Sequence, residues 1–164
     1  MSVEKQTLEN IWKLLDSVMD PEVPVISIVD LGIVRDVILE DIGLKIIITP
    51  TYSGCPAMDY IENDIRQTLG KEGFDSIAIE TVLSPAWTTD WLTEKAKKKL
   101  QEYGIAPPEG SIDKSSLLSE PKNITCPHCK STETEMISQF GSTACKALYK
   151  CKDCLEPFDY FKCI

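Results

Sequence analysis

An apolar strand runs directly into the start of a helix in the stretch Gly43-Leu-Lys-Ile-Ile-Ile-Thr49-Pro-Thr-Tyr-Ser-Gly-Cys55-Pro56. β-branched residues favour the extended conformation, and proline suits the first turn of a helix. Apolar side chains then recur at the spacing of one helical face, at Met58, Ile61, Ile65 and Leu69. The pattern therefore predicts a strand-to-helix junction with Cys55 at the helix start.

The segments around this junction predict an α-β-β-α-β-α order. A helix is expected before Pro21, ending at Asp20, because the residue before a proline disfavours the helical conformation. Strands are expected at 33–39, 43–49 and 77–83, and a last helix at 88–103. We expect a two-layer α+β domain over residues 1–105, with the helices packed on a small mixed sheet.

Two Cys-x-x-Cys pairs mark a second module. They are Cys126-Pro-His-Cys129 and Cys151-Lys-Asp-Cys154, separated by 21 residues. Two such turns bring four thiolates around one tetrahedral Zn²⁺, so the spacing predicts a zinc-ribbon hairpin with strands at 135–140 and 146–150. So short a segment buries little apolar surface and needs its metal to fold. An iron–sulfur cluster, a single iron and a redox dithiol remain alternatives.

The composition changes between these two regions. Residues 106–122 are rich in proline and serine, which predicts a linker before a ribbon at 123–164. Residues 1–108 carry 18 acidic and 10 basic side chains, whereas 124–164 carry 5 of each. This asymmetry also favours two units.

Composition disfavours several classes of protein. The net charge of −9 disfavours nucleic-acid binding, and no apolar run is long enough to span a membrane. The N-terminus has no signal-peptide pattern, so a cytoplasmic protein with reduced thiols is expected. Cys145 and Cys163 lie outside the two pairs; each is a buried apolar residue or a spare thiol near the metal.

Cys55 stands apart from the other cysteines. At a helix start, unpaired N–H groups and the helix dipole stabilise negative charge, so we expect a lowered thiol pKa. Loops that carry Asp20, Glu22, Asp30 and Thr51 can reach the same end of the sheet, where thiolate and carboxylates would suit transient iron or an iron–sulfur cluster. The alternative is a packed cysteine that caps the helix. A Cys–His nucleophile is disfavoured because His128, in the ribbon, is the sole histidine.

Several motifs resemble known families. The runs Asp20-Pro-Glu-Val-Pro24, Val29-Asp-Leu-Gly-Ile-Val34 and Thr49–Pro56 resemble the SufT-type iron–sulfur assembly family. Further runs narrow the match: Ser84-Pro-Ala-Trp-Thr-Thr-Asp-Trp91, Phe140–Tyr149 and Glu156–Ile164. Together with the ribbon, they resemble the PaaD family of accessory proteins of phenylacetyl-CoA epoxidase in aerobic phenylacetate degradation.

The resemblance implies a maturation factor and not an enzyme. Cys55 would be its key thiol, with Asp20, Glu22 and Thr51 around it, and Cys126, Cys129, Cys151 and Cys154 would be the ribbon ligands. Implied partners are the epoxidase subunits and iron–sulfur carrier proteins, and a homodimer stays open. Two rival functions also stay open: a thiol enzyme acting on a CoA thioester, and a zinc-ribbon module that binds protein or nucleic acid.

Overall fold

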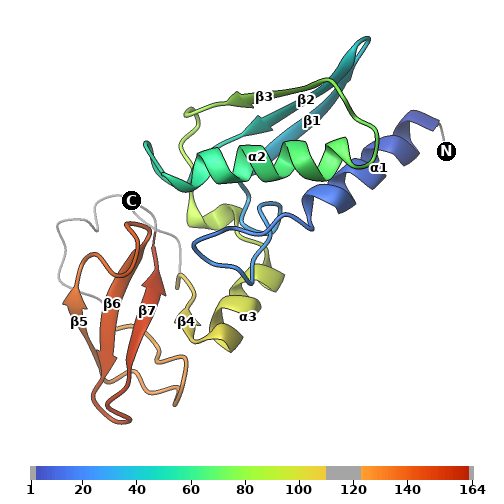
Figure 1. The fold of residues 1–164 in the computed structure, drawn as a ribbon. Coiled ribbons are helices and arrows are strands. Elements are labelled where there is room, and N and C mark those ends of the chain that lie inside the picture. The colour runs from blue at the N-terminus through green and yellow to red at the C-terminus, as the bar shows by residue number, and fades with distance from the viewer. Residues whose placement is uncertain (1–2, 110–122, 163–164) are drawn as a thin grey trace. The chain divides into compact units, whose positions relative to one another are not determined.

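The computed structural model describes residues 3–109 and 123–162, which divide into two compact units between Trp87 and Thr88. Each unit has its own sheet, of three strands in the first and four in the second (Figure 1). Helices and sheets are both present, which confirms the predicted α+β class. Within the described ranges no helix is both long enough and apolar enough to cross a membrane.

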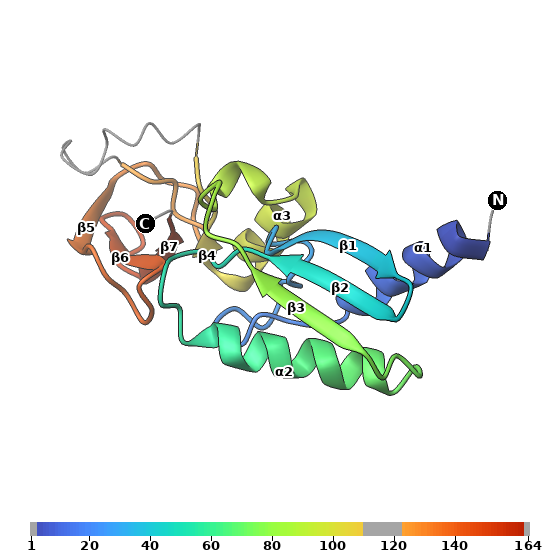
Figure 2. The same cartoon turned by 90° about the horizontal axis from the view of Figure 1, so that it is seen from above.

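The first unit is a three-stranded sheet with two helices on one face (Figures 1 and 2). Its elements are α1 (Val3–Leu15), β1 (Val34–Glu40), β2 (Gly43–Ile48), α2 (Ala57–Gly70) and β3 (Ile77–Thr81). Strands β1 and β2, both expected from the sequence, pair as an antiparallel hairpin. Helix α2 then crosses over, so that β3 pairs with β2 in parallel. The ends of β2 and β3 consequently meet at the same edge of the sheet.

Alternation along β2 builds the core of this unit. Leu44, Ile46 and Ile48 are all within 1% of complete burial, while the residues between them are half-buried. Helix α2 contributes one buried stripe, consisting of Ala57, Ile61, Ile65 and Leu69. Every second residue of β2 and every third or fourth residue of α2 faces the core. Packing of these two sets of side chains fixes the orientation of the loop at Cys55 that joins the strand to the helix.

Helix α1 ends at Leu15, so the expectation of a helix up to Asp20 is wrong. The Ser17 hydroxyl donates to the carbonyl of Leu14 at 2.6 Å, and the Val18 N–H donates to Leu15 at 3.1 Å. These bonds tighten the last turn and end the helix before the proline takes effect. The chain then runs through a turn-rich loop that buries Val23, Ile26, Ile28 and Leu31.

The second unit is a four-stranded sheet preceded by helical segments. These are a 3₁₀ turn, η1 (Thr89–Trp91), and α3 (Glu94–Tyr103). The strands are β4 (Ile105–Ala106), β5 (Thr134–Ser138), β6 (Lys146–Cys151) and β7 (Pro157–Phe161), in the order β4-β7-β6-β5. Strands β5 and β6 form the predicted ribbon hairpin. Strands β4 and β7 are not predicted by the sequence pattern.

A single helix over 88–103 is also wrong, because two threonines compete for the helix start. The Thr88 side chain accepts the N–H of Asp90, and the Thr93 side chain accepts the N–H of Ala96 at 3.0 Å. Each threonine is an N-cap with extended backbone, so the helical path is broken between them. Along α3, Ala96 and Leu100 are buried, whereas Tyr103 is exposed.

Strand β4 connects α3 to the ribbon sheet. Ile105 and Ala106 pair in parallel with Asp159 and Tyr160 of β7. Ala106 is completely buried and belongs to the same apolar cluster as Cys126 and Cys151. The first residue of the predicted linker is therefore part of a strand, and residues 110–122 lie outside the described ranges. Domain boundaries at 105 and 123 stay a prediction.

Gly104 is the residue that turns the chain from α3 into β4, and its replacement tests this connection. It is left-handed, with φ +91°, and an added Cβ would lie 3.2 Å from Cε1 of His128. We expect Gly104→Ala to lower the free energy of unfolding of the zinc-loaded protein by about 1–2 kcal/mol.

Gly70→Ala is the matched control, since Gly70 is in helical conformation and an added Cβ would meet open space. This variant should be neutral or up to about 1 kcal/mol more stable. Denaturant unfolding of both variants checks the pair, and equal stabilities would contradict the role of Gly104.

Candidate functional site

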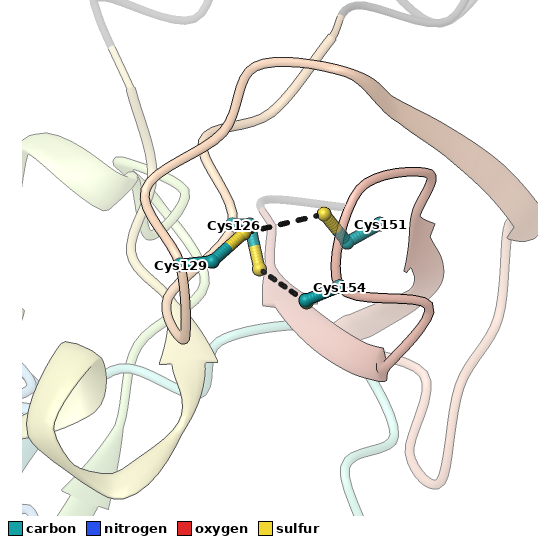
Figure 3. A group of neighbouring side chains, drawn as sticks. All are labelled: Cys126, Cys129, Cys151 and Cys154. Atoms are coloured by element: carbon teal, nitrogen blue, oxygen red, sulfur yellow. Dashed lines mark hydrogen bonds between the residues drawn. The ribbon is translucent and has the colours of Figure 1, made fainter.

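The four ribbon cysteines converge on one point (Figure 3). All four sulfur atoms lie within 4.8 Å of one another. Cys126 Sγ is 3.8 Å from Cys154 Sγ, and Cys129 Sγ is 3.5 Å from Cys151 Sγ. Each contact joins one Cys-x-x-Cys turn to the other, so the two turns close around a common centre.

The two turns have the same local geometry. The residue after the second cysteine is left-handed in both, with φ +66° at Lys130 and φ +65° at Leu155. In each turn the next N–H then donates to the sulfur of that second cysteine, from Ser131 to Cys129 and from Glu156 to Cys154. These N–H donors orient the sulfurs and stabilise negative charge on them.

The sulfurs differ in how readily they lose a proton. The N–H of Cys154 donates to Cys151 and lowers the pKa of the Cys151 thiol to about 7. At Cys154 the Glu156 N–H acts in the same direction, but desolvation and the neighbouring thiols outweigh it and raise the pKa to about 12. Four thiolates so close together need a cation between them.

These distances fit one tetrahedral ion. Four sulfurs about 2.3 Å from a Zn²⁺ ion would be about 3.8 Å apart, close to the separations found. A multi-iron cluster needs a wider cage than four sulfurs within 4.8 Å of one another provide. Zn²⁺ held by Cys126, Cys129, Cys151 and Cys154 is therefore the arrangement that the donor set supports best.

Among the described residues, Cys145 and His128 lie outside this group of four sulfurs. Cys145 is buried, and its sulfur lies 3.1 Å from Oγ1 of Thr143. His128 is exposed, outside the ligand group, with its ring beside Gly104. Cys163 lies outside the described residues.

Cys55 occupies the junction between β2 and α2, as the sequence predicts. Gly54 before it is left-handed, with φ +79°, and turns the chain toward the helix. The Cys55 N–H donates to the carbonyl of Tyr52 at 3.3 Å, and the Cys55 carbonyl accepts from Met58 at 3.2 Å. Cys55 as a whole is 9% exposed, so the residue is largely shielded from solvent.

Burial raises the pKa of the Cys55 thiol, so the expectation of a lowered value is wrong. The Ala57 N–H and the Tyr52 hydroxyl do donate to the sulfur, as a helix start predicts. Desolvation is the larger effect, and the carboxylates of Glu22 and Asp20 add to it by repelling a thiolate. The thiol therefore keeps its proton at neutral pH until a cation or a partner changes its surroundings.

The predicted neighbours of Cys55 are only partly brought together. Oδ1 of Asp20 accepts the N–H groups of Glu22 and Val23, both at 2.8 Å, so this carboxylate also shapes its own loop. Thr51 is buried in the Cys55 loop. In the described chain the ribbon cysteines are the one metal-ligand group of three or more that converges, so Cys55, Asp20 and Glu22 do not form a closed metal site.

Two polar groups in this loop are not predicted from the sequence. Tyr52 donates its hydroxyl to Cys55, and a tyrosine three residues before the cysteine was the available signal. Oγ1 of Thr49 is buried and has no hydrogen-bond partner among the described residues, which no pattern could have indicated.

Two known family profiles match the chain, one in each unit. The PaaD zinc beta ribbon domain profile matches residues 110–162, and the iron-sulfur cluster assembly protein profile matches residues 8–80. A domain of unknown function, DUF59, from Bacillus anthracis has a TM-score of 0.55 and 28% identity, over 58% of this chain and 92% of its own.

Two curated relatives extend the comparison. A protein of Escherichia coli K12 whose name makes it a component of 1,2-phenylacetyl-CoA epoxidase is 50% identical, over 96% of this chain and 93% of its own length. An Fe-S protein maturation auxiliary factor of Porphyromonas gingivalis is 34% identical, over 58% of this chain and 91% of its own length. The architecture is thus that of an iron–sulfur-assembly domain joined to a zinc ribbon. The chain belongs to the PaaD family.

Removal of one ribbon cysteine tests the metal centre. The wild-type chain should bind one zinc ion, and Cys151→Ser should lose most of it because a hydroxyl is a poor replacement for a thiolate. Cys145→Ser is the control, since Cys145 lies outside the ligand group, and it should keep its zinc. Metal analysis checks both variants; full zinc content in Cys151→Ser would contradict the assignment.

The pH dependence of alkylation tests the raised pKa of Cys55. Labelling should be slow at neutral pH and should keep rising beyond the ordinary titration range of a thiol, because only the thiolate reacts. Glu22→Gln removes a nearby negative charge, so it should lower this pKa and speed labelling at pH 7. Glu40→Gln, at the far end of β1, should change nothing. Rates are read from the Cys55 peptide by mass spectrometry, and an inflection below pH 8 would show that burial does not control the thiol.

Proposed function

We propose that this protein is a non-catalytic accessory factor for the assembly of an iron–sulfur or di-iron centre in phenylacetyl-CoA epoxidase. Its assembly-domain profile, its maturation-factor relative and its epoxidase-named relative support an accessory role. The observation that carries the proposal is Cys55 itself. A soft sulfur ligand sits at a helix start beside two carboxylates, with too few converging ligands to keep a metal permanently.

A single thiol ligand of this kind suits the transfer of iron or a cluster better than its permanent binding. When iron or a cluster arrives as cargo, the Cys55 S–H bond breaks, sulfur binds iron, and the proton leaves to a nearby base such as the Glu22 carboxylate. The acceptor protein supplies the remaining ligands. Because burial and the carboxylates favour the protonated thiol, the cargo is released readily once those ligands compete.

The rival functions have less support. A thiol enzyme needs a base that activates its nucleophile, yet the Cys55 pKa is raised and the sole histidine, His128, lies in the second unit. A nucleic-acid-binding module needs a basic surface, and the chain carries a net charge of −9.

Within this proposal the two units have separate tasks. Cys55, Asp20, Glu22 and Thr51 form the transfer site, while the zinc ribbon keeps the second unit folded and presents it to a partner. The partners are the epoxidase subunits and iron–sulfur carrier proteins, and the compartment is the cytoplasm. These assignments follow the resemblance of the sequence and the names of the relatives.

Cys55→Ser separates transfer from packing, because the swap is nearly isosteric but replaces a soft sulfur by a poor oxygen ligand. We expect the variant to fold and to keep its zinc, yet to leave co-expressed epoxidase subunits short of iron or sulfide and inactive. Cys145→Ser, at a buried thiol in the second unit, should support full activity. Iron, sulfide and epoxidase activity are measured in each strain. Normal iron content and activity of the epoxidase in the Cys55→Ser strain would contradict the transfer role and leave Cys55 with a packing role only.

A further inference from the structure

The net charge of the protein belongs entirely to one unit. Residues 1–87 carry 15 acidic and 6 basic side chains, whereas residues 88–164 carry 11 of each. The unit that contains Cys55 therefore has the whole surplus of −9. A surface with such a surplus attracts basic partners over about a Debye length, roughly 10 Å at 0.1 M salt.

Three of the five exposed large apolar side chains described in this unit lie at its Cys55 end. Five large apolar residues of the unit are exposed among those described: Met19, Ile38, Ile42, Tyr60 and Leu83. Met19 is 41% exposed and precedes Asp20, whose carboxylate is near Cys55; Tyr60 is 70% exposed in the second turn of α2; Leu83 is 59% exposed just after β3.

Topology places these three side chains at the same end of the sheet. Ile48 pairs with Thr81, and the Val82 N–H donates to the Ile48 carbonyl at 2.9 Å, so β2 and β3 end together. The start of α2, the end of β3 and the loop after α1 lie at this end in both views (Figures 1 and 2). The β1–β2 turn, with Ile42, lies at the other end.

We propose that this end of the first unit is the docking surface for a basic face of the protein that receives the cargo. We call it the Cys55 face, and it consists of Met19, Glu22, Asp59, Tyr60 and Leu83. The inference rests on the proposed function and adds the chemistry of the partner. Asp59 lies exposed in the first turn of α2, one residue before Tyr60.

The two kinds of side chain have different tasks in this face. The carboxylates steer a positively charged surface toward Cys55 and repel acidic proteins, which gives speed and selectivity. Tyr60, Met19 and Leu83 give the desolvated contact, since aromatic and methionine side chains often anchor interfaces. Docking then brings the acceptor's own ligands within reach of the Cys55 sulfur.

Matched variants at the two ends of the unit test the proposal. The full chain, loaded with zinc, is titrated against purified epoxidase complex of the same organism. Tyr60→Ala and Asp59→Lys should each weaken binding about tenfold, in keeping with a central anchor and a close charge. Ile42→Ala and Asp75→Lys repeat these changes at the opposite end, on exposed side chains, and should bind within about twofold of wild type.

Salt dependence and the thiol variant complete the test. Wild-type binding should weaken steeply between about 0.1 M and about 1 M salt, and Asp59→Lys should reduce that slope. Circular dichroism and zinc content verify that each variant is folded. Equal binding by both pairs of variants would overturn the docking face, even if Cys55→Ser still abolished maturation. The opposite result is that Cys55→Ser supports maturation while Tyr60→Ala weakens binding. That result would overturn the proposed function but would still support the Cys55 face as a docking surface.

Discussion

Electrostatic repulsion among four thiolates governs the second unit. The sulfurs of Cys126, Cys129, Cys151 and Cys154 are too close for all of them to ionise without a cation at their centre. The apolar cluster beside them is small, and two of its members, Cys126 and Cys151, belong to the group of four sulfurs as well. Metal binding and core formation are therefore one event, which is how so short a stretch of chain obtains a defined sheet.

The first unit uses its cysteine in the opposite way. The ribbon brings four thiols and several N–H donors to one point, whereas Cys55 has a single sulfur, two donors and two repelling carboxylates. In the proposed function, the first arrangement retains a metal and the second gives it up. The same chemical group thus has a structural role in one unit and a transfer role in the proposed function of the other, and the difference lies in how many ligands converge.

Sequence patterns located most of the chemistry but not all of the geometry. The Cys-x-x-Cys spacing predicted the thiol cluster, and the run from Gly43 to Pro56 predicted the junction at Cys55, because both depend on local contacts. The sequence pattern did not predict where α1 ends, because a hydrogen bond from a serine side chain contributes to that end. It did not predict β4, because the strand that pairs with β4 lies far along the chain. The direction of the shift in the Cys55 pKa was not predicted, because it depends on burial and on carboxylates that are distant in sequence but close in the fold.

Because of strand β4, the ribbon cannot be separated from the rest of the protein simply by cutting the chain before its first cysteine. Ile105 and Ala106 precede residues 110–122, yet they pair with β7, and Ala106 lies in the ribbon's apolar cluster. A single peptide-bond cleavage within residues 110–122 would leave the two pieces associated without a covalent link. The sheet of the ribbon thus includes residues on both sides of positions 110–122, so a ribbon cut out at residue 123 would lack its edge strand β4.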